Sequence, residues 1–341
     1  MMRVTTLAAA MTGAAAMKMP LWINESTICD GGHCDTPNLA YQWAADIQPG
    51  YQWGDAGGYC GSWATQRAVL ASGAWISQQQ VRDHTSSCGP NDEEILSCNI
   101  EEAWVNLKID YERFDYDKEP LPQTTAYAKW LKRQLVQKRT VAWMIMWSGQ
   151  AYPIYNLEPP AGMYGHVEPV IGIQSNHPLN DTTVYDDDVV LHFTDGGVET
   201  VHRGLTTLPC DWDGVKGHKA DCGEYKYGVG NPYGFGWAVK GFTHDEKPLV
   251  PASLKIKPWN REPDTRSGED PIPIAGTLTA MDLEFAHTYE IYRWDSVDEA
   301  FTYTNKYKKV TFTPAEETYV YEDDKPFMSD SATYYRVVKV Q

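Results

Sequence analysis

Residues 57–73 read GGYCGSWATQRAVLASG and place a cysteine, Cys60, between a glycine-rich turn and a helical pattern. The pattern predicts a helix from Gly61 to about Gly73, because its apolar residues can share one face: Trp63, Ala64, Ala68, Val69 and Ala71. The dipole and the N–H groups at a helix N-terminus stabilise a thiolate, and the same N–H groups can hold an oxyanion. The stretch therefore indicates a nucleophilic cysteine. The alternatives are an inert buried thiol and a cysteine paired with another one.

Cysteine spacing sets Cys60 apart from the six other cysteines of the chain. Those six fall into close sequential pairs: Cys29 and Cys34, Cys88 and Cys98, Cys210 and Cys222. In an oxidising compartment such pairs favour three local disulfides, each contributing ~2–3 kcal/mol because the loops are short. Spacing does not fix the connectivity, but it leaves Cys60 outside the pairs.

The beginning of the sequence has the pattern of an export signal. Residues 1–3 (Met-Met-Arg) are positively charged, and residues 4–16 are uncharged and rich in alanine. This pattern predicts a signal peptide over residues 1–20 and a secreted, extracellular protein. Asn24 and Asn180 each start a tripeptide that fits N-glycosylation. The apolar run is too short to span a bilayer, and no other segment reaches transmembrane length.

Charge and motif content exclude several classes of function. The formal net charge is −17, from 46 acidic and 29 basic residues, so the surface repels nucleic acid and anionic membranes. The sequence contains no HExxH motif, no CxxC pair, no histidine cluster at ligand spacing and no glycine-rich phosphate loop. We therefore expect neither a metal nor an organic cofactor, and no nucleic-acid partner.

Helical patterns come first and strand patterns follow, which predicts an α+β fold. After the helix at Gly61, three more helices are expected: residues 78–83 capped by Ser77, a helix from Asn91 towards Leu107, and one from Thr124 or Thr125 to about Lys138. Strands are expected at residues 141–147, 167–173, 189–193 and 237–242. Together these elements predict a first domain over residues 21–247.

A second domain is expected over residues 248–341. A proline-rich segment, residues 246–273, is interpreted as a linker or the entry to an edge strand. Alternating patterns then predict strands at residues 288–294, 309–313, 318–321 and 333–340. They suggest a small all-β sandwich that resembles the fibronectin type III class. A glycan or a protein is the kind of partner considered for this domain.

A nucleophilic thiol needs a base, and His166 is the best candidate among nine histidines. His166 follows Gly165 and opens the expected strand VEPVIGI. The next strand leads into a turn, VVLHFTDGG, which offers Asp195 at the strand end. His192 lies on the same strand and is interpreted as a structural neighbour.

These motifs, in this order, resemble papain-like cysteine peptidases, and most closely the branch of bacteriocin-leader (double-glycine) peptidases. The Cys-Gly-x-x-Ala motif of that branch is matched by CGSWA at residues 60–64, and ISQQQVRD at residues 76–83 is similar to its next helix. A helix and strand at residues 130–147 and the Gly-His strand at residues 164–173 follow in the same order. The resemblance covers roughly residues 50–243.

The resemblance implies a catalytic triad of Cys60, His166 and Asp195, in which Asp195 orients His166. It also implies an oxyanion-hole glutamine, usually six residues before the cysteine. Gly54 stands at that position here, and Gln52 lies eight residues before Cys60. Either the turn bulges and Gln52 still reaches the oxyanion, or the side-chain donor is lost.

The sequence thus predicts a secreted cysteine peptidase or amidase that acts on a peptide or protein substrate through a thioester. One alternative is an acyltransferase on the same fold, as in the phytochelatin-synthase relatives, where an amine takes the place of water. Another is a binding or effector protein that uses a degenerate papain-like scaffold.

Overall fold

The computed structural model describes most of the chain between residues 39 and 340: residues 39–53, 59–86, 99–115, 118–119, 123–148, 163–193, 200–207, 227–228, 235–248, 250–257 and 271–340. The expected signal peptide, the Asn24 tripeptide and the six paired cysteines lie outside the described residues.

The described helices are α1 (Cys60–Leu70), α2 (Gln78–Asp83), α3 (Ile100–Asn106) and α4 (Gln123–Val136), with a 3-10 turn η3 (Leu205–Thr207). The helices expected at residues 61–73 and 78–83 are confirmed as α1 and α2. Ser77 caps α2, since its side chain accepts a hydrogen bond from the N–H of Gln80 at 3.0 Å. Helix α3 ends at Asn106, as the pattern towards Leu107 predicts, while Asn91 lies outside the described residues.

A large antiparallel sheet forms the body of the first part of the chain. Its strands lie in the order β3 (Ile109–Asp115), β9 (Phe235–Phe242), β4 (Val141–Ser148), β5 (Met163–Ser175), β6 (Val189–Phe193) and β7 (Thr200–Gly204). Two further strands pair at its sides: β1 (Tyr41–Ala44) with β5, and β8 (Tyr227–Gly228) with β4. The fold is therefore a mixed α+β fold, and strands β4, β5, β6 and β9 confirm the four expected in this part.

Two smaller antiparallel sheets follow. One contains β10 (Ala252–Lys257), β11 (Pro273–Ala280) and β14 (Tyr319–Glu322), with β15 (Phe327–Met328) also on β11. The other has the order β13 (Lys308–Phe312), β12 (Tyr289–Trp294), β16 (Ala332–Lys339) and β2 (Ala74–Ile76). The strands expected near residues 288–340 are confirmed as β12, β13, β14 and β16. The resemblance to the fibronectin type III class stays a prediction.

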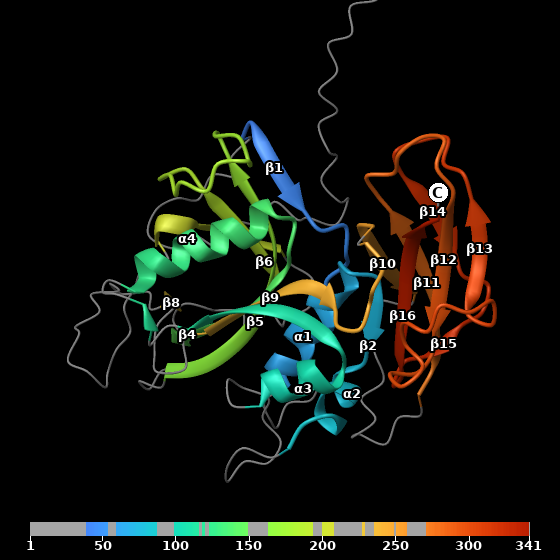
Figure 1. Ribbon diagram of the computed structural model, residues 1–341. Helices are drawn as coiled ribbons and strands as arrows, with labels where there is room; N and C mark the ends of the chain where they lie inside the picture. The colour runs from blue at the N-terminus through green and yellow to red at the C-terminus, as the bar shows by residue number, and fades with distance from the viewer. Residues whose placement is uncertain are drawn as a thin grey trace, which may run out of the picture.

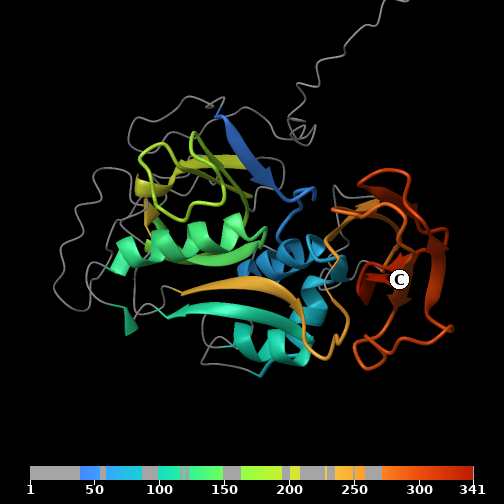
Figure 2. The same cartoon turned by 45° about the horizontal axis from the view of Figure 1, so that its top comes forward.

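The large sheet lies between α4 on one face and α1 and α3 on the other (Figures 1 and 2). On the α4 face, a Cβ added to Gly236 would lie 2.6 Å from the ring of Trp130, so only glycine lets α4 approach. On the opposite face, the neighbouring Trp237 donates its indole N–H to Glu101 of α3 at 2.9 Å. Alternation along β9 thus identifies which helix covers which face.

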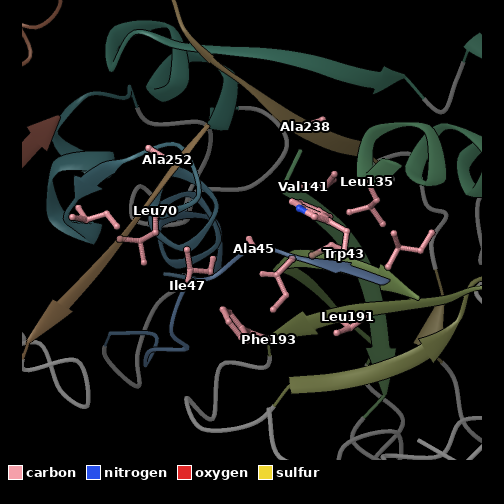
Figure 3. Close-up of a cluster of buried hydrophobic side chains, with 14 of the residues drawn as sticks. Trp43, Ala45, Ile47, Leu70, Leu135, Val141, Leu191, Phe193, Ala238 and Ala252 are labelled. Atoms are coloured by element: carbon pink, nitrogen blue, oxygen red, sulfur yellow. The ribbon is translucent and has the colours of Figure 1, made fainter. Parts of the chain in front are cut away.

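Helix α1 is buried along its whole length, because it lies between the large sheet and the small sheets. Thr65, one of its buried polar residues, accepts a hydrogen bond from the indole of Trp104 at 2.7 Å. Figure 3 shows part of the apolar cluster around it, in which Leu70 of α1 lies near Ile47 and Ala252 from other elements. One continuous core therefore joins the first part of the chain to the C-terminal sheets.

Strand β2 connects the two parts in an unexpected way. It follows α1 in the sequence, yet it pairs with β16, with Ala74 opposite Tyr334 and Ile76 opposite Ala332 (Figure 1). The backbone N–H of Ser77 also donates to Ser331 at 3.1 Å. The division at residues 247 and 248 stays a prediction, but one of the two smaller sheets includes a strand from before it.

The proline-rich segment contains a strand at the edge of a sheet, which agrees with the second of the two interpretations, the entry to an edge strand. Residues 252–257 form β10, which pairs with β11 over its full length. Ala252, Leu254 and Ile256 are buried, whereas Lys257 is exposed, so the segment has the alternation of a half-buried strand. The prolines flank this strand instead of interrupting it. No helix in the described residues is long and apolar enough to cross a membrane.

Candidate functional site

Cys60 is the first residue of α1 and is present as a thiol that is only 4% exposed. Tyr59 precedes the helix and offers no side-chain cap, so the first-turn N–H groups are not capped by it. Its carbonyl accepts the first helical hydrogen bond, from Trp63, at 2.8 Å. A sulfur atom here lies in the positive field of the helix N-terminus, in surroundings with little water to weaken that field.

The segment before the glycine-rich turn is fixed onto α1. The indole of Trp63 donates to the carbonyl of Gly50 at 2.8 Å. A Cβ on Gly50 would lie 2.4 Å from the guanidinium carbon of Arg67, so this close approach requires glycine. The rings of Trp53 and Tyr59 lie 6.0 Å apart, which brings the end of the segment against the residue before Cys60.

Gln52 lies within this fixed segment, between two backbone groups that Gln78 binds. The Gln78 side chain donates to the carbonyl of Tyr51 at 2.8 Å and accepts from the N–H of Trp53 at 2.9 Å. The Oε1 atom of Gln52 is buried and has no hydrogen-bond partner among the described residues. The backbone on both sides of Gln52 is therefore held in place.

His166 lies on β5, and its side chain is 7% exposed. Its Nε2 atom is 3.7 Å from Oε1 of Glu168, two residues along the same strand and on the same face. The sequence-based prediction for this role, Asp195, lies outside the described residues. In the described residues, the carboxylate that faces His166 is Glu168.

Glu168 also contacts the next strand. Its Oε2 atom is 2.8 Å from Nδ1 of His192, and Nε2 of His192 accepts a hydrogen bond from Nε of Arg203 at 3.0 Å. Because Nδ1 of His192 faces oxygen acceptors and Nε2 faces a donor, the ring is neutral with its proton on Nδ1. Trp143 packs against this ring with a centroid distance of 5.1 Å. The result is a buried series of side-chain interactions that runs from Glu168 through His192 to Arg203.

Burial dominates the protonation of this cluster. It lowers the pKa of His166 and of His192, although the Glu168 carboxylate opposes both shifts. Burial alone would raise the pKa of Glu168, but its interactions with His192, and then with His166 and Arg203, lower it to about 2. Glu168 is therefore ionised at neutral pH, and both histidines are neutral.

Alternation along β5 separates the immediate surroundings of the two predicted catalytic residues. Cys60, Ala64 and Ala68 follow one another at helical spacing and belong to the same buried cluster as Met144 and Val167. Val167 and Met144 are directly opposite each other on paired strands, so they share the sheet face that α1 covers. His166 instead shares the face that carries Glu168 and His192. Helix α1 nonetheless packs closely along β5, and β5 contributes side chains to both faces of the sheet.

Sequence reasoning missed Glu168 and Arg203 and interpreted His192 as an isolated structural neighbour. The signal was present in the strand patterns VEPVIGI and VVLHF, which each carry one ionisable residue in an apolar run. A buried charge requires a partner, so two such residues on successive strands predict a contact. In the described residues, no cluster of three or more His, Cys, Asp or Glu side chains could hold a metal ion.

Comparison with known proteins adds a distant likeness. No family model and no curated protein matches the chain. Among solved structures, the chain is similar to that of the clostridial cysteine protease Cwp84 after propeptide cleavage. The sequence identity is 11% and the TM-score 0.33, with 86% of this chain and 81% of that chain covered. At this distance, a function has to be inferred from the residues of the site.

Proposed function

We propose that the protein is a papain-like cysteine hydrolase that cleaves peptide or amide bonds, with Cys60 as the nucleophile and His166 as the base. The observation that carries this proposal is the position of Cys60. It is a buried thiol at the N-terminus of α1, and α1 packs along the strand that carries His166. Thiolate, helix N-terminus and imidazole are the groups that acyl transfer from a peptide requires.

The chemistry follows from these roles. The Cys60 thiolate attacks the acyl carbonyl carbon, and the oxygen that becomes negative is stabilised by the backbone N–H of Cys60 and the amide of Gln52. As the C–N bond breaks, protonated His166 gives its proton to the leaving amine. His166 then takes a proton from water, which attacks the thioester and releases the acid and the thiol. The sequence-based prediction for the group that orients His166 is Asp195.

The remaining expectations belong to the same proposal. The chain would be exported by a signal peptide over residues 1–20, and three local disulfides would stabilise it outside the cell. The hydrolase domain would span residues 21–247, followed by a sandwich over residues 248–341 related to fibronectin type III. A peptide or protein would be the substrate, and the sandwich would bind a glycan or a protein.

Alkylation of Cys60 tests the central claim. The full chain is treated with iodoacetamide between pH 5 and pH 9, and the Cys60 peptide is quantified by mass spectrometry beside a His166→Ala control. We expect alkylation that stays fast down to about pH 5–6 and slows in the variant, because a His-stabilised thiolate persists at low pH. A profile that follows an ordinary thiol, with a pKa near about 8.5, would contradict the proposal.

A non-catalytic binding protein is the second candidate, and one observation favours it. His166 lies on the sheet face with Glu168 and His192, while Cys60 belongs to the buried cluster that contains Val167, whose side chain lies on the other face. On this second candidate, Cys60 alkylates as an ordinary thiol and His166→Ala has no effect on its rate. If Cys60 is reactive, product analysis with an added amine separates hydrolysis from acyl transfer.

A further inference from the structure

We propose that Glu168, held by His192 and Arg203, is the positioning carboxylate for His166. The inference rests on the proposed cysteine-hydrolase function and adds a residue to its site. It assigns to a neighbour on the same strand the role that the sequence suggests for Asp195.

The geometry divides the two oxygens of Glu168 between two rings. Oε2 lies 2.8 Å from Nδ1 of His192, a hydrogen bond, and Oε1 lies 3.7 Å from Nε2 of His166. The second distance is longer than a hydrogen bond, as is common for catalytic pairs without substrate, and it shortens if His166 gains a proton.

The partners of Glu168 fix its position. His192 can donate to Glu168 only through Nδ1–H, and Arg203 enforces that tautomer by donating to Nε2. His192 and Arg203 lie on adjacent strands, β6 and β7, with Val190 opposite Arg203 in the register. The carboxylate therefore cannot rotate away from His166 without breaking this buried chain.

Charge gives the arrangement a catalytic consequence. Glu168 is fully buried and stays ionised, since its partners lower its pKa to about 2. Burial lowers the pKa of His166, and the Glu168 charge is the interaction that opposes this shift. A Cys60–His166 ion pair needs a protonated imidazole, so Glu168 favours the form of His166 that the reaction starts from.

A purely structural role is the competing explanation, and the chain offers a matched control for it. Asp188 is buried at the start of β6 and pairs with buried Lys132 at 2.7 Å. Asp188→Asn removes a buried carboxylate from the same region without touching His166. Glu168→Gln keeps the size and one acceptor of Glu168 but removes its charge, and Glu168→Asp keeps the charge on a shorter side chain.

Two measurements on the full chain test the proposal. NMR titration of the histidine Cε1–H signals reports the His166 pKa directly, and the pH profile of Cys60 alkylation reports its effect on the thiol. We expect Glu168→Gln to lower the His166 pKa further. We expect it to reduce the alkylation rate of Cys60 at pH 6 about tenfold, which corresponds to a change of about one unit in pKa. Glu168→Asp should recover part of both effects, and Asp188→Asn should lower the melting temperature while leaving both unchanged.

The outcomes separate this inference from the proposed function. If Cys60 in the wild-type chain alkylates as an ordinary thiol, the hydrolase proposal fails, whatever Glu168 does to His166. If the wild type has a low-pKa thiolate and neither Glu168→Gln nor Glu168→Asp moves the His166 titration or the profile, the role of Glu168 is overturned. An Asp195→Asn variant that alone abolishes the low-pH reactivity would return the positioning role to Asp195.

Discussion

Gln78 holds the backbone of Trp53: its Oε1 atom accepts the Trp53 N–H at 2.9 Å, while its Nε2 atom donates to the carbonyl of Tyr51 at 2.8 Å. These two bonds enclose Gln52, the residue proposed to complete the oxyanion hole. The helix that carries Gln78 thus supports a segment that lies on the opposite side of the glycine-rich turn in the sequence.

Substitution of Gln52 tests whether this support serves catalysis. We predict that Gln52→Ala lowers kcat for a chromogenic ester by ~10²–10³, the usual loss for one oxyanion donor. Gln78→Ala should lower it by about tenfold, because the hydrogen bonds that hold the backbone on either side of Gln52 are lost while Gln52 itself remains. Iodoacetamide alkylation of Cys60 creates no oxyanion, so its rate should stay unchanged in both variants.

Gln80→Ala, on the same helix, is the control for Gln78→Ala and should leave kcat at the wild-type value. Equal kcat values for Gln52→Ala and the wild type would show that Gln52, eight residues before Cys60, does not donate to the oxyanion.

His202 makes the stability of the fold sensitive to pH. Its ring is buried on β7, and neither ring nitrogen has a hydrogen-bond partner among the described residues. Burial, with a smaller contribution from His192, lowers its pKa to about 4. Below the unfolded value of about 6.5, the unfolded chain binds a proton that the folded chain does not. The contribution of the neutral His202 ring to stability is therefore fully present above about pH 6.5 and is lost as the pH falls towards about 4.

At low pH the wild type loses part of its free energy of unfolding. We predict that His202→Leu makes this loss smaller by roughly 3 kcal/mol, which is the free-energy equivalent of the difference between the two pKa values. Urea unfolding at pH 7.5 and pH 4.5 measures it, and the difference between the two values should shrink in the variant. At pH 7.5, the variant should be at least as stable as the wild type, since leucine leaves no buried polar atom unsatisfied. If His202→Leu leaves the pH dependence of stability unchanged, that dependence arises from other groups.

Trp75 tests how tightly the two parts of the chain are joined. It lies on β2, is fully buried, and donates its indole N–H to Ser329 at 3.2 Å. We predict that Trp75→Ala lowers the free energy of unfolding by ~3–5 kcal/mol, as expected for a large core aromatic. Because β2 and β16 share a sheet, tryptophan fluorescence and Cys60 protection should be lost in one transition.

Val105→Ala is the control on α3, where the side chain is 60% exposed, and its effect should stay within about 0.5 kcal/mol. Two separate transitions, with Cys60 still protected after the first, would support independent domains divided at residues 247 and 248.

The sequence was most informative where a pattern needs no distant partner. The apolar run VAWMIMW predicts β4, and Ser77 predicts the start of α2, because hydrophobic burial and capping are local properties. Strand β3 was missed, since IDYERFD is largely polar. Glu112 in its centre binds Arg133 and the indole of Trp130, both on α4, which only the folded chain brings together.

The candidate site divides in the same way. Cys60 at a helix start follows from its neighbours in the sequence, and the structure places it there. The partnership of Glu168 with His192 depends on the register between β5 and β6, which has an irregularity between Val170 and Gly172. A one-residue shift in a strand exchanges its two faces, so spacing alone could not predict which acid faces His166.

The pairing of β2 with β16 has a consequence for how the protein is made. Residues 74–76 leave the ribosome long before residues 332–339, and at about 5–20 residues per second the delay is on the order of tens of seconds. During that time β2 presents an open edge, and the Ser331 carbonyl that receives the N–H of Ser77, the cap of α2, has yet to be synthesised. The surroundings of Cys60 are therefore completed only after β16 has been synthesised. In an incomplete nascent chain, β2 and the start of α2 lack their partners in and just before that strand.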